Sequence, residues 1–198
     1  AVVEPTANIV TDLVERTGVT AGDLVVVQGP GPIGLLAAMV ARAAGAREVV
    51  LIGTPGDVAL RLKTAAELGF TQLVNIAERD PVKAVLELTG GRGADVVVEC
   101  SGSPRAIPMT VDLVRKKGRI CVIGLTGGRT VEVPWDKFSF KVVDVHVLPT
   151  RKPTEKACIS VPSQDGLADA SPVFAHAFLF SPQILSDYGQ FQVSHRST

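Results

Sequence analysis

The chain has 198 residues, of which 46% are hydrophobic and 20% charged, so it can bury a sizeable core and does not have the composition of a disordered chain. Lys plus Arg and Asp plus Glu number 20 each, and this balance gives no reason to expect nucleic acid or a membrane surface as a partner. No apolar run reaches the roughly 18 residues that a membrane-spanning helix needs.

Three cysteines, Cys100, Cys121 and Cys158, are far apart, and neither a CxxC pair nor a nearby histidine accompanies them. An odd number of widely spaced cysteines argues against a disulfide framework and favours a reducing compartment. We therefore expect a cytoplasmic protein whose own residues form no metal site. The first residues also lack the basic segment and apolar core of a secretory signal.

The first two predicted strands enclose a glycine-rich turn. An apolar segment at 23–28 precedes Gly-Pro-Gly-Pro-Ile-Gly at 29–34, and strong helix formers at 35–44 lead to a second apolar segment at 48–52. Strand, GxGxxG, helix and strand in this order predict a turn that binds the pyrophosphate of a dinucleotide at a helix N-terminus. A glycine-rich turn without a ligand is the alternative. The predicted cofactor-binding residues here are Gly29, Gly31, Pro32, Ile33 and Gly34.

Helices and strands continue to alternate up to residue 147. The sequence predicts helices at 57–68, 81–89 and 106–116, and strands at 72–76, 94–99, 119–124 and 141–147. This alternation is typical of an α/β fold with a doubly wound parallel sheet. Ligands of such sheets lie beyond the carboxyl ends of the strands, so we expect one crevice lined by the turns at 29–34, 53–57, 100–103 and 124–128.

The end of the chain differs in composition from the rest. From Arg151 onward it is rich in proline and serine and shows little periodicity. We expect a dinucleotide-binding domain at 1–150 and an irregular tail at 151–198. Within the domain, Trp135 is expected to fill a hydrophobic gap, and the basic run at 115–117 is expected to complement the dipole at a helix C-terminus.

A set of segments spread over residues 4–147 is specific in combination. They are Glu4-Pro5 and residues 18–23, 29–34, 61–62, 67–69, 88–95, 98–102 and 118–124. These segments resemble the coenzyme-binding half of zinc-dependent medium-chain dehydrogenases, in particular the sorbitol and threonine dehydrogenase branch. The resemblance implies a Rossmann fold and, in the parent protein, NAD(P)-dependent hydride transfer between a secondary alcohol or polyol and nicotinamide. Residues 172–178 resemble, more loosely, the segment that leads back to the family's catalytic domain.

The resemblance also implies a zinc ion, bound in the parent protein by an N-terminal domain that this sequence does not include. Glu4 is the expected catalytic residue, because its counterpart in the polyol branch lies close to the zinc-bound water; a solvated carboxylate is the alternative interpretation. The chain alone is expected to bind cofactor with little or no turnover. Two other functions stay open: a non-catalytic nucleotide-binding or interaction domain, and a zinc-free NADPH-dependent reductase of the same superfamily.

The end of the second strand bears on the choice between NAD and NADP. A carboxylate there would bind the ribose 2′-hydroxyl of NAD, but the strand ends in Gly53-Thr54. Thr54 could bind a hydroxyl or a phosphate, and Arg61 could pair with a phosphate or stack on adenine. Asp57 could serve the cofactor or simply cap the next helix. The resemblance favours NAD, with NADP as the open alternative.

The nicotinamide end of the cofactor is inferred from the resemblance. It implies that backbone groups of two turns hold the carboxamide and face the ring, and that a third loop follows the last strand. The implied residues are Ser101, Gly102, Ile123, Gly124, Leu125, Leu148, Pro149 and Thr150. The family commonly pairs through a sheet edge, and residues 142–147 are a plausible edge for a homo-oligomer.

Overall fold

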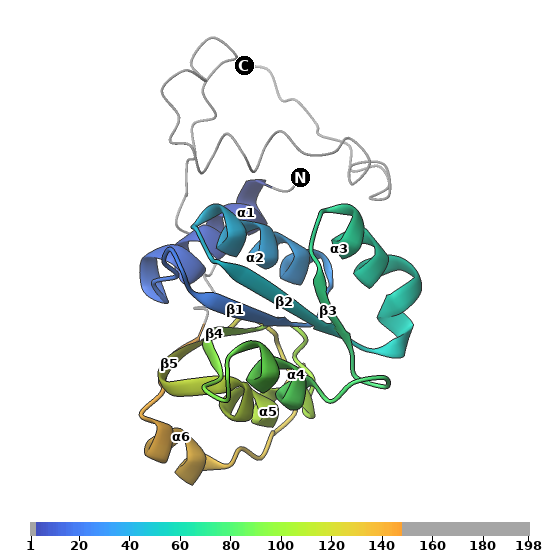
Figure 1. Ribbon diagram of the computed structural model, residues 1–198. Helices are drawn as coiled ribbons and strands as arrows, with labels where there is room; N and C mark the ends of the chain where they lie inside the picture. Colours follow the sequence, from blue (N-terminus) through green and yellow to red (C-terminus); the bar gives the residue numbers. More distant parts are fainter. Residues whose placement is uncertain (1–2, 148–198) are drawn as a thin grey trace. The chain divides into compact units, whose positions relative to one another are not determined.

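The computed structural model describes residues 3–147 and contains one six-stranded sheet (Figure 1). Its strands follow the order β3-β2-β1-β4-β5-β6, and every neighbouring pair is parallel. The strands are β1 (Leu24–Gln28), β2 (Glu48–Gly53), β3 (Gln72–Asn75), β4 (Ala94–Glu99), β5 (Val114–Val122) and β6 (Asp144–Val147). The order reverses direction at β1, which is the topology of a doubly wound sheet and confirms the predicted fold class.

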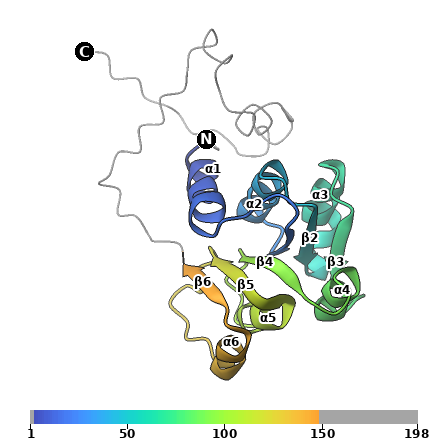
Figure 2. The same ribbon diagram turned by 60° about the vertical axis from the view of Figure 1, so that its left-hand side comes forward.

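Helices cover both faces of the sheet (Figures 1 and 2). On one face lie α1 (Val3–Val10), η1 (Thr11–Arg16), α2 (Pro32–Ala43), η2 (Pro55–Asp57), η3 (Val58–Leu62) and α3 (Lys63–Glu67). On the other lie α4 (Pro81–Leu88), α5 (Ala106–Leu113) and α6 (Trp135–Lys141). None of these helices within residues 3–147 is both long and apolar enough to cross a membrane.

The core consists of two apolar layers, one on each face of the sheet. Because side chains alternate along a strand, Val25 and Val27 of β1 pack into the layer beneath α1, α2 and α3, whereas Leu24 and Val26 pack into the layer beneath α4 and α5. All residues of β1 are buried, as expected for a central strand of a parallel sheet.

Local signals in the sequence account for several helix ends. The carboxylate of Asp80 accepts a hydrogen bond from the Lys83 N–H at 2.9 Å, and Pro81 occupies the first turn of α4, as predicted. At the start of α2 the cap residue is Gly31, whose lack of a side chain leaves the first turn without a side-chain cap.

Several expectations about local structure are wrong, and some elements were missed. The helix predicted at 106–116 ends at Leu113, and β5 begins at Val114, so the basic run at 115–117 lies in a strand. The ion pair between Arg115 and Asp95 holds this run beside β4. Trp135 is 71% exposed and fills no gap. The strand predicted at 141–147 begins only at Asp144, because Lys141 is the last residue of α6. The sequence analysis predicted neither α6 nor α1 and η1, which lie before residue 23.

Ion pairs join the amino ends of the three central strands. The Asp95 carboxylate accepts the backbone N–H of Leu24 at 2.8 Å and the Arg115 Nε–H at 2.6 Å. Burial alone would raise the pKa of Asp95, but these hydrogen bonds and the charge of Arg115 outweigh burial and lower it. Arg119 pairs with Asp23 at 2.8 Å and also donates to the carbonyl of Gly18. Charged side chains therefore hold together the amino ends of the strands, at the end of the sheet opposite the glycine-rich turns.

Candidate cofactor site

The turns that follow the strands meet at the carboxyl edge of the sheet, as predicted. A methyl group on Gly29 would lie 2.9 Å from the Cα of Ser101, and one on Gly53 would lie 3.0 Å from the Cγ of Pro30. A methyl group on Gly124 would lie 2.3 Å from the nitrogen of Gly102. The turn after β1 therefore packs against the turns after β2 and β4, and the turn after β4 packs against the turn after β5.

The 29–34 turn is built on three glycines with different tasks. Gly29 has a φ of +91°, a conformation that favours glycine, and its N–H donates to the Ile52 carbonyl at 2.9 Å. A methyl group on Gly34 would lie 1.9 Å from the carbonyl oxygen of Gly29, so only glycine allows α2 to pack this closely. A methyl group on Gly31 would meet no atom within 4 Å, which leaves open space beside the start of the helix.

This turn has the physical features of an anion site. Helix α2 has 12 residues, no acidic residue in its first turn and no side-chain cap, so its N-terminal N–H groups and its dipole face the space beside Gly31. Pro32 occupies the first position of the helix and Ile33 the second. Open space beside an uncapped helix end is what an anion site requires, and binding of a pyrophosphate there stays a prediction.

The turn after β2 is closed by a capping box. The Asp57 carboxylate accepts the Thr54 N–H at 2.8 Å and the Thr54 hydroxyl at 2.7 Å, and it pairs with Arg61 at 2.8 Å. Burial alone would raise the pKa of Asp57, but the hydrogen bonds from Thr54 and the charge of Arg61 hold it below its ordinary value. The Asp57 side chain thus closes the short helix η2 in which it lies and makes no cap hydrogen bond to η3, so the predicted cap of the following helix is not seen, while the Arg61 side chain stays 53% exposed.

The predicted nicotinamide-end residues lie in two touching turns. A methyl group on Gly102 would lie 2.1 Å from the carbonyl oxygen of Leu125, so the two backbones are in direct contact. The Leu125 side chain is 74% exposed beside this contact. Beneath it lies the fully buried side chain of Glu99, which the sequence analysis did not single out. The predicted residues Leu148, Pro149 and Thr150 lie outside the described residues, as does the tail at 151–198.

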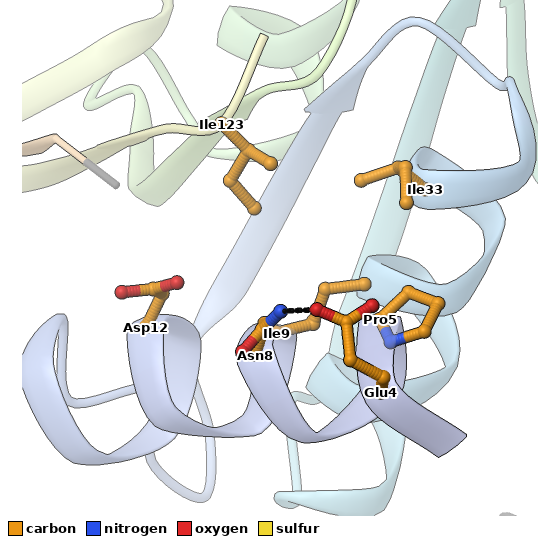
Figure 3. A pocket seen from close by; sticks show the side chains of 7 residues that line it. All are labelled: Glu4, Pro5, Asn8, Ile9, Asp12, Ile33 and Ile123. Carbon is orange, nitrogen blue, oxygen red and sulfur yellow. Dashed lines mark hydrogen bonds between the residues drawn. The ribbon is translucent and has the colours of Figure 1, made fainter. Parts of the chain in front are cut away.

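A cavity of about 160 Å³ lies between α1 and the turns that follow β1 and β5 (Figure 3). Its lining residues are Glu4, Pro5, Asn8, Ile9, Asp12, Ile33 and Ile123. Figure 3 shows Ile33 and Ile123 across the cavity from Glu4 and Asn8. The Asn8 amide donates to Oε1 of Glu4 at 2.5 Å. The structure therefore brings the predicted catalytic residue together with two predicted cofactor residues.

The polar wall of this cavity follows one helix face. Glu4, Asn8 and Asp12 are spaced four residues apart, so their side chains project from the same side of α1 and η1. Asp12 is only 3% exposed and pairs with Arg16 at 2.8 Å. The sequence analysis missed Asn8 and Asp12, although a four-residue spacing of polar side chains next to the apolar Ile9 was available as a signal.

The described residues include no group of side chains arranged to hold a metal ion, and the thiols of Cys100 and Cys121 are not reactive. Within residues 3–147, no three His, Cys, Asp or Glu side chains are grouped so that they could hold a metal ion, so the residues present do not fit a zinc site. Burial raises the pKa of the Cys121 thiol to about 11 and that of Cys100 well above its ordinary value, which keeps both protonated at neutral pH. Cys158 lies outside the described residues.

Comparison with known proteins agrees with this geometry. The model of the family described as "Zinc-binding dehydrogenase" matches residues 32–156. The sorbitol dehydrogenase of Halalkalibacterium halodurans is 42% identical over 72% of this chain and 41% of its own length. The L-threonine 3-dehydrogenase of Bacillus licheniformis is 36% identical over 88% of this chain and 49% of its own length.

A solved structure shows the same likeness in three dimensions. A zinc-binding dehydrogenase from Sinorhizobium meliloti 1021, solved bound to NADP, superposes with a TM-score of 0.65 and 30% identity over 73% of this chain and 42% of that protein. The chain spans less than half of the length of each of these three proteins. The family model, the two relatives and the fold agree with the resemblance noted in the sequence: the chain belongs to the zinc-binding dehydrogenase family.

Proposed function

We propose that this chain is the NAD(P)-binding part of a dehydrogenase that transfers hydride between a secondary alcohol or polyol and nicotinamide. The observation that carries the proposal is the open space beside Gly31 in front of the uncapped N-terminus of α2. The named relatives act on sorbitol and L-threonine, which are both alcohols. The bound dinucleotide would supply the hydride acceptor, and the protein would supply orientation and a dry site.

Different residues of this chain would bind different parts of the cofactor. The start of α2 would bind the pyrophosphate. Ile33 and Ile123 would shield the nicotinamide ring from water, because both are apolar and line the cavity beside the cofactor turns. Backbone groups of the turns at 101–102 and 124–125 would hold the carboxamide. No step is assigned to zinc, because the described residues offer no set of ligands for it.

Glu4 would serve as a hydrogen-bond acceptor at the substrate end of the cavity. Asn8 donates to Oε1 of Glu4, which fixes the carboxylate and leaves Oε2 to accept a hydrogen from a substrate hydroxyl or from water. Such an acceptor, which lines the same cavity as Ile33 and Ile123, is a candidate for moving the hydroxyl proton during alcohol oxidation. This role supports the prediction that Glu4 is catalytic in the complete protein.

For the cofactor we propose that NADP binds at least as tightly as NAD. The strand ends in Gly53, where a methyl group would lie 3.2 Å from the Asp57 Cβ and 3.0 Å from the Pro30 Cγ, so any side chain there would be tightly packed and the strand end carries no carboxylate. The Asp57 carboxylate is already engaged by Thr54 and Arg61. A 2′-phosphate would thus meet the half-exposed Arg61 guanidinium instead of a free carboxylate. The NADP bound to the Sinorhizobium meliloti structure is consistent with this choice.

We also propose that two copies of the protein pair through β6. This strand is the outer strand of the sheet on the side of β5, and its Val145 and Val147 are 44% and 60% exposed. An exposed apolar edge strand with unpaired backbone groups is a ready template for another strand. A second copy offers the same edge, so a two-fold pair would satisfy both.

Calorimetric titration of the purified 198-residue chain with NAD, NADP, NADH and NADPH tests the cofactor proposal. Saturable binding of any of them supports the site at residues 29–34, and the order of affinities tests the proposed preference for NADP. If none binds at millimolar concentration while the chain is folded by circular dichroism, the proposed function is wrong for this chain.

A further inference from the structure

Glu99 is the last residue of β4 and is fully buried, with an exposed fraction of 0%. It lies in register with Gln28 of β1 and Val122 of β5, at the point where the central strands end. A buried carboxylate is costly unless hydrogen-bond donors or a cation compensate for the lost water. Within residues 3–147, neither a lysine nor an arginine forms an ion pair with Glu99, so hydrogen-bond donors must do this work.

Among the described residues, every hydrogen-bond donor to the Glu99 carboxylate comes from the next turn of the chain. Oε1 accepts the N–H of Ser101 at 2.9 Å and also the hydroxyl of Ser101. Oε2 accepts the N–H of Gly102 at 3.1 Å. The Ser101 hydroxyl in turn accepts the N–H of Ser103 at 3.1 Å. One buried side chain therefore fixes the path of the backbone through this turn.

The main chain of Glu99 holds the neighbouring turn in the same way. Its carbonyl oxygen accepts the N–H groups of Ile123 and Gly124, both at 2.8 Å. A methyl group on Gly124 would lie 2.4 Å from Oε2 of Glu99, so the glycine lies directly on the carboxylate. The two turns assigned to the nicotinamide end are thus both anchored on a single residue.

We propose that Glu99 is a positioning residue for the nicotinamide end of the cofactor. The proposal rests on the proposed cofactor function, because it assumes that the ring lies against these turns. It goes further in assigning a buried side chain, without contact to solvent, to the recognition of one half of the ligand. The hydrogen-bond partners of Glu99 include no residue of the turn at 53–57, where the adenosine half would lie. Disturbing Glu99 should therefore act chiefly on the nicotinamide half of the dinucleotide.

The test compares a whole cofactor with its truncated form. The 198-residue chain and its Glu99→Gln variant are titrated with NADPH and with 2′-phospho-ADP-ribose, which lacks the nicotinamide; NADH and ADP-ribose replace them if the chain prefers NAD. Glutamine keeps the shape of the side chain but turns an amide N–H₂ toward backbone donors. We expect the variant to bind the reduced dinucleotide about tenfold or more weakly than the wild type, while its affinity for the truncated ligand stays within about twofold.

The matched control is Glu67→Gln, because the Glu67 side chain is 64% exposed and lies in α3, away from these turns. It should bind both ligands as the wild type does. If Glu99→Gln does not fold, as judged by its thermal unfolding, Ser101→Ala takes its place, since it removes one of the donors to the carboxylate and leaves the glutamate buried. The same selective loss is expected from it.

Several results would overturn the inference and can be told apart from failure of the proposed function. Equal losses for both ligands would show that Glu99 acts on the whole fold. Unchanged binding of both would show that the turn holds its path without the carboxylate. Equal wild-type affinities for the reduced dinucleotide and the truncated ligand would show that these turns recognise no nicotinamide. Only a wild-type chain that binds neither ligand would contradict the cofactor function itself.

Discussion

Gly34 lies so close to Gly29 that a methyl group on Gly34 would come within 1.9 Å of the Gly29 carbonyl oxygen. At Gly31, in the same turn, a methyl group would meet nothing within 4 Å. Gly34 is therefore needed for packing, whereas Gly31 keeps a space open. The two positions therefore allow the stability of the turn and its binding of a ligand to be tested separately.

Alanine at Gly34 should lower the stability of the fold, whereas alanine at Gly31 should lower the affinity for the dinucleotide. Gly34→Ala should lower the free energy of unfolding by about 1–3 kcal/mol, because the turn and α2 must move apart. Gly31→Ala should change it by less than about 0.5 kcal/mol, since Gly31 has a φ of −69° and open surroundings. The same Gly31→Ala variant should bind the dinucleotide at least about tenfold more weakly. Denaturant unfolding and calorimetry measure the two effects; unchanged binding by Gly31→Ala would mean that the space holds no pyrophosphate.

Arg61 should decide how well a 2′-phosphate is accepted. Arg61→Ala removes the half-exposed guanidinium next to Asp57, so the affinity for NADP should fall about tenfold while the affinity for NAD changes little. Lys63→Ala is the matched control, because it removes an exposed cation two residues away with only a weak partner at 3.9 Å. Parallel titrations with NAD and NADP give the ratio. A ratio that Arg61→Ala leaves unchanged would contradict recognition of the phosphate by this residue.

Asp95 should make the fold sensitive to acid. Its pKa is lower in the folded chain than the ordinary value of 3.8, so its contribution to stability is present above pH 3.8 and is lost as the pH falls through the folded pKa. Asp95→Asn should lower the free energy of unfolding near pH 7 by about 1.5–3 kcal/mol, because the N–H of Leu24 and the guanidinium of Arg115 lose a charged partner.

The pH profile separates this effect from general damage. Between pH 7 and pH 2, the stability of Asp95→Asn should fall less steeply than that of the wild type, because one depressed titration is gone. Asp136→Asn, at the exposed start of α6, should leave both the stability and its slope unchanged. Urea titrations across this range give the slopes, and parallel profiles for Asp95→Asn and wild type would refute the assignment.

A charge on β6 should prevent pairing of two copies. Val145→Lys places an ammonium group on the apolar edge strand and should raise the dissociation constant of the dimer at least about tenfold. Val58→Lys is the control, because Val58 is 43% exposed against 44% for Val145 but lies in η3, away from this edge. Sedimentation velocity over a range of concentrations measures both variants. A wild-type chain that stays monomeric, or a Val145→Lys dimer as tight as the wild type, would rule out this edge as the interface.

Much of the sheet and the 29–34 turn could be predicted because their signals are local. A run of valines between a polar residue and a glycine predicts a buried strand, and the spacing of Gly29, Gly31 and Gly34 predicts the turn without further information. The end of α5 could not be predicted in this way. Arg115 and Lys116 favour a helix, but in the structure they lie in β5, which pairs with β4, and Arg115 contacts Asp95, twenty residues earlier in the chain.

The site residues that the sequence analysis missed share one property: their role depends on a long-range environment. Glu99 follows a run of valines and looks like the polar end of a strand, and its burial depends on the strands on either side of it. Asn8 and Asp12 gain their position only when α1 packs over the carboxyl edge of the sheet. Residue type and spacing describe what a segment can do, whereas tertiary packing decides what it faces.

The two edges of this sheet are maintained by different means. Charged side chains such as Asp95 and Arg119 tie the amino ends together, while at the carboxyl ends glycines let the turns pack on one another and the carboxylates of Asp57 and Glu99 accept hydrogen bonds from them. Ligand preference can consequently be altered at exposed positions such as Arg61 or Leu125 without touching the ties that maintain the fold. These exposed positions make the chain a suitable starting point for laboratory evolution toward a chosen cofactor, provided that close-packed or buried residues at the same end, such as Gly34 and Glu99, are kept.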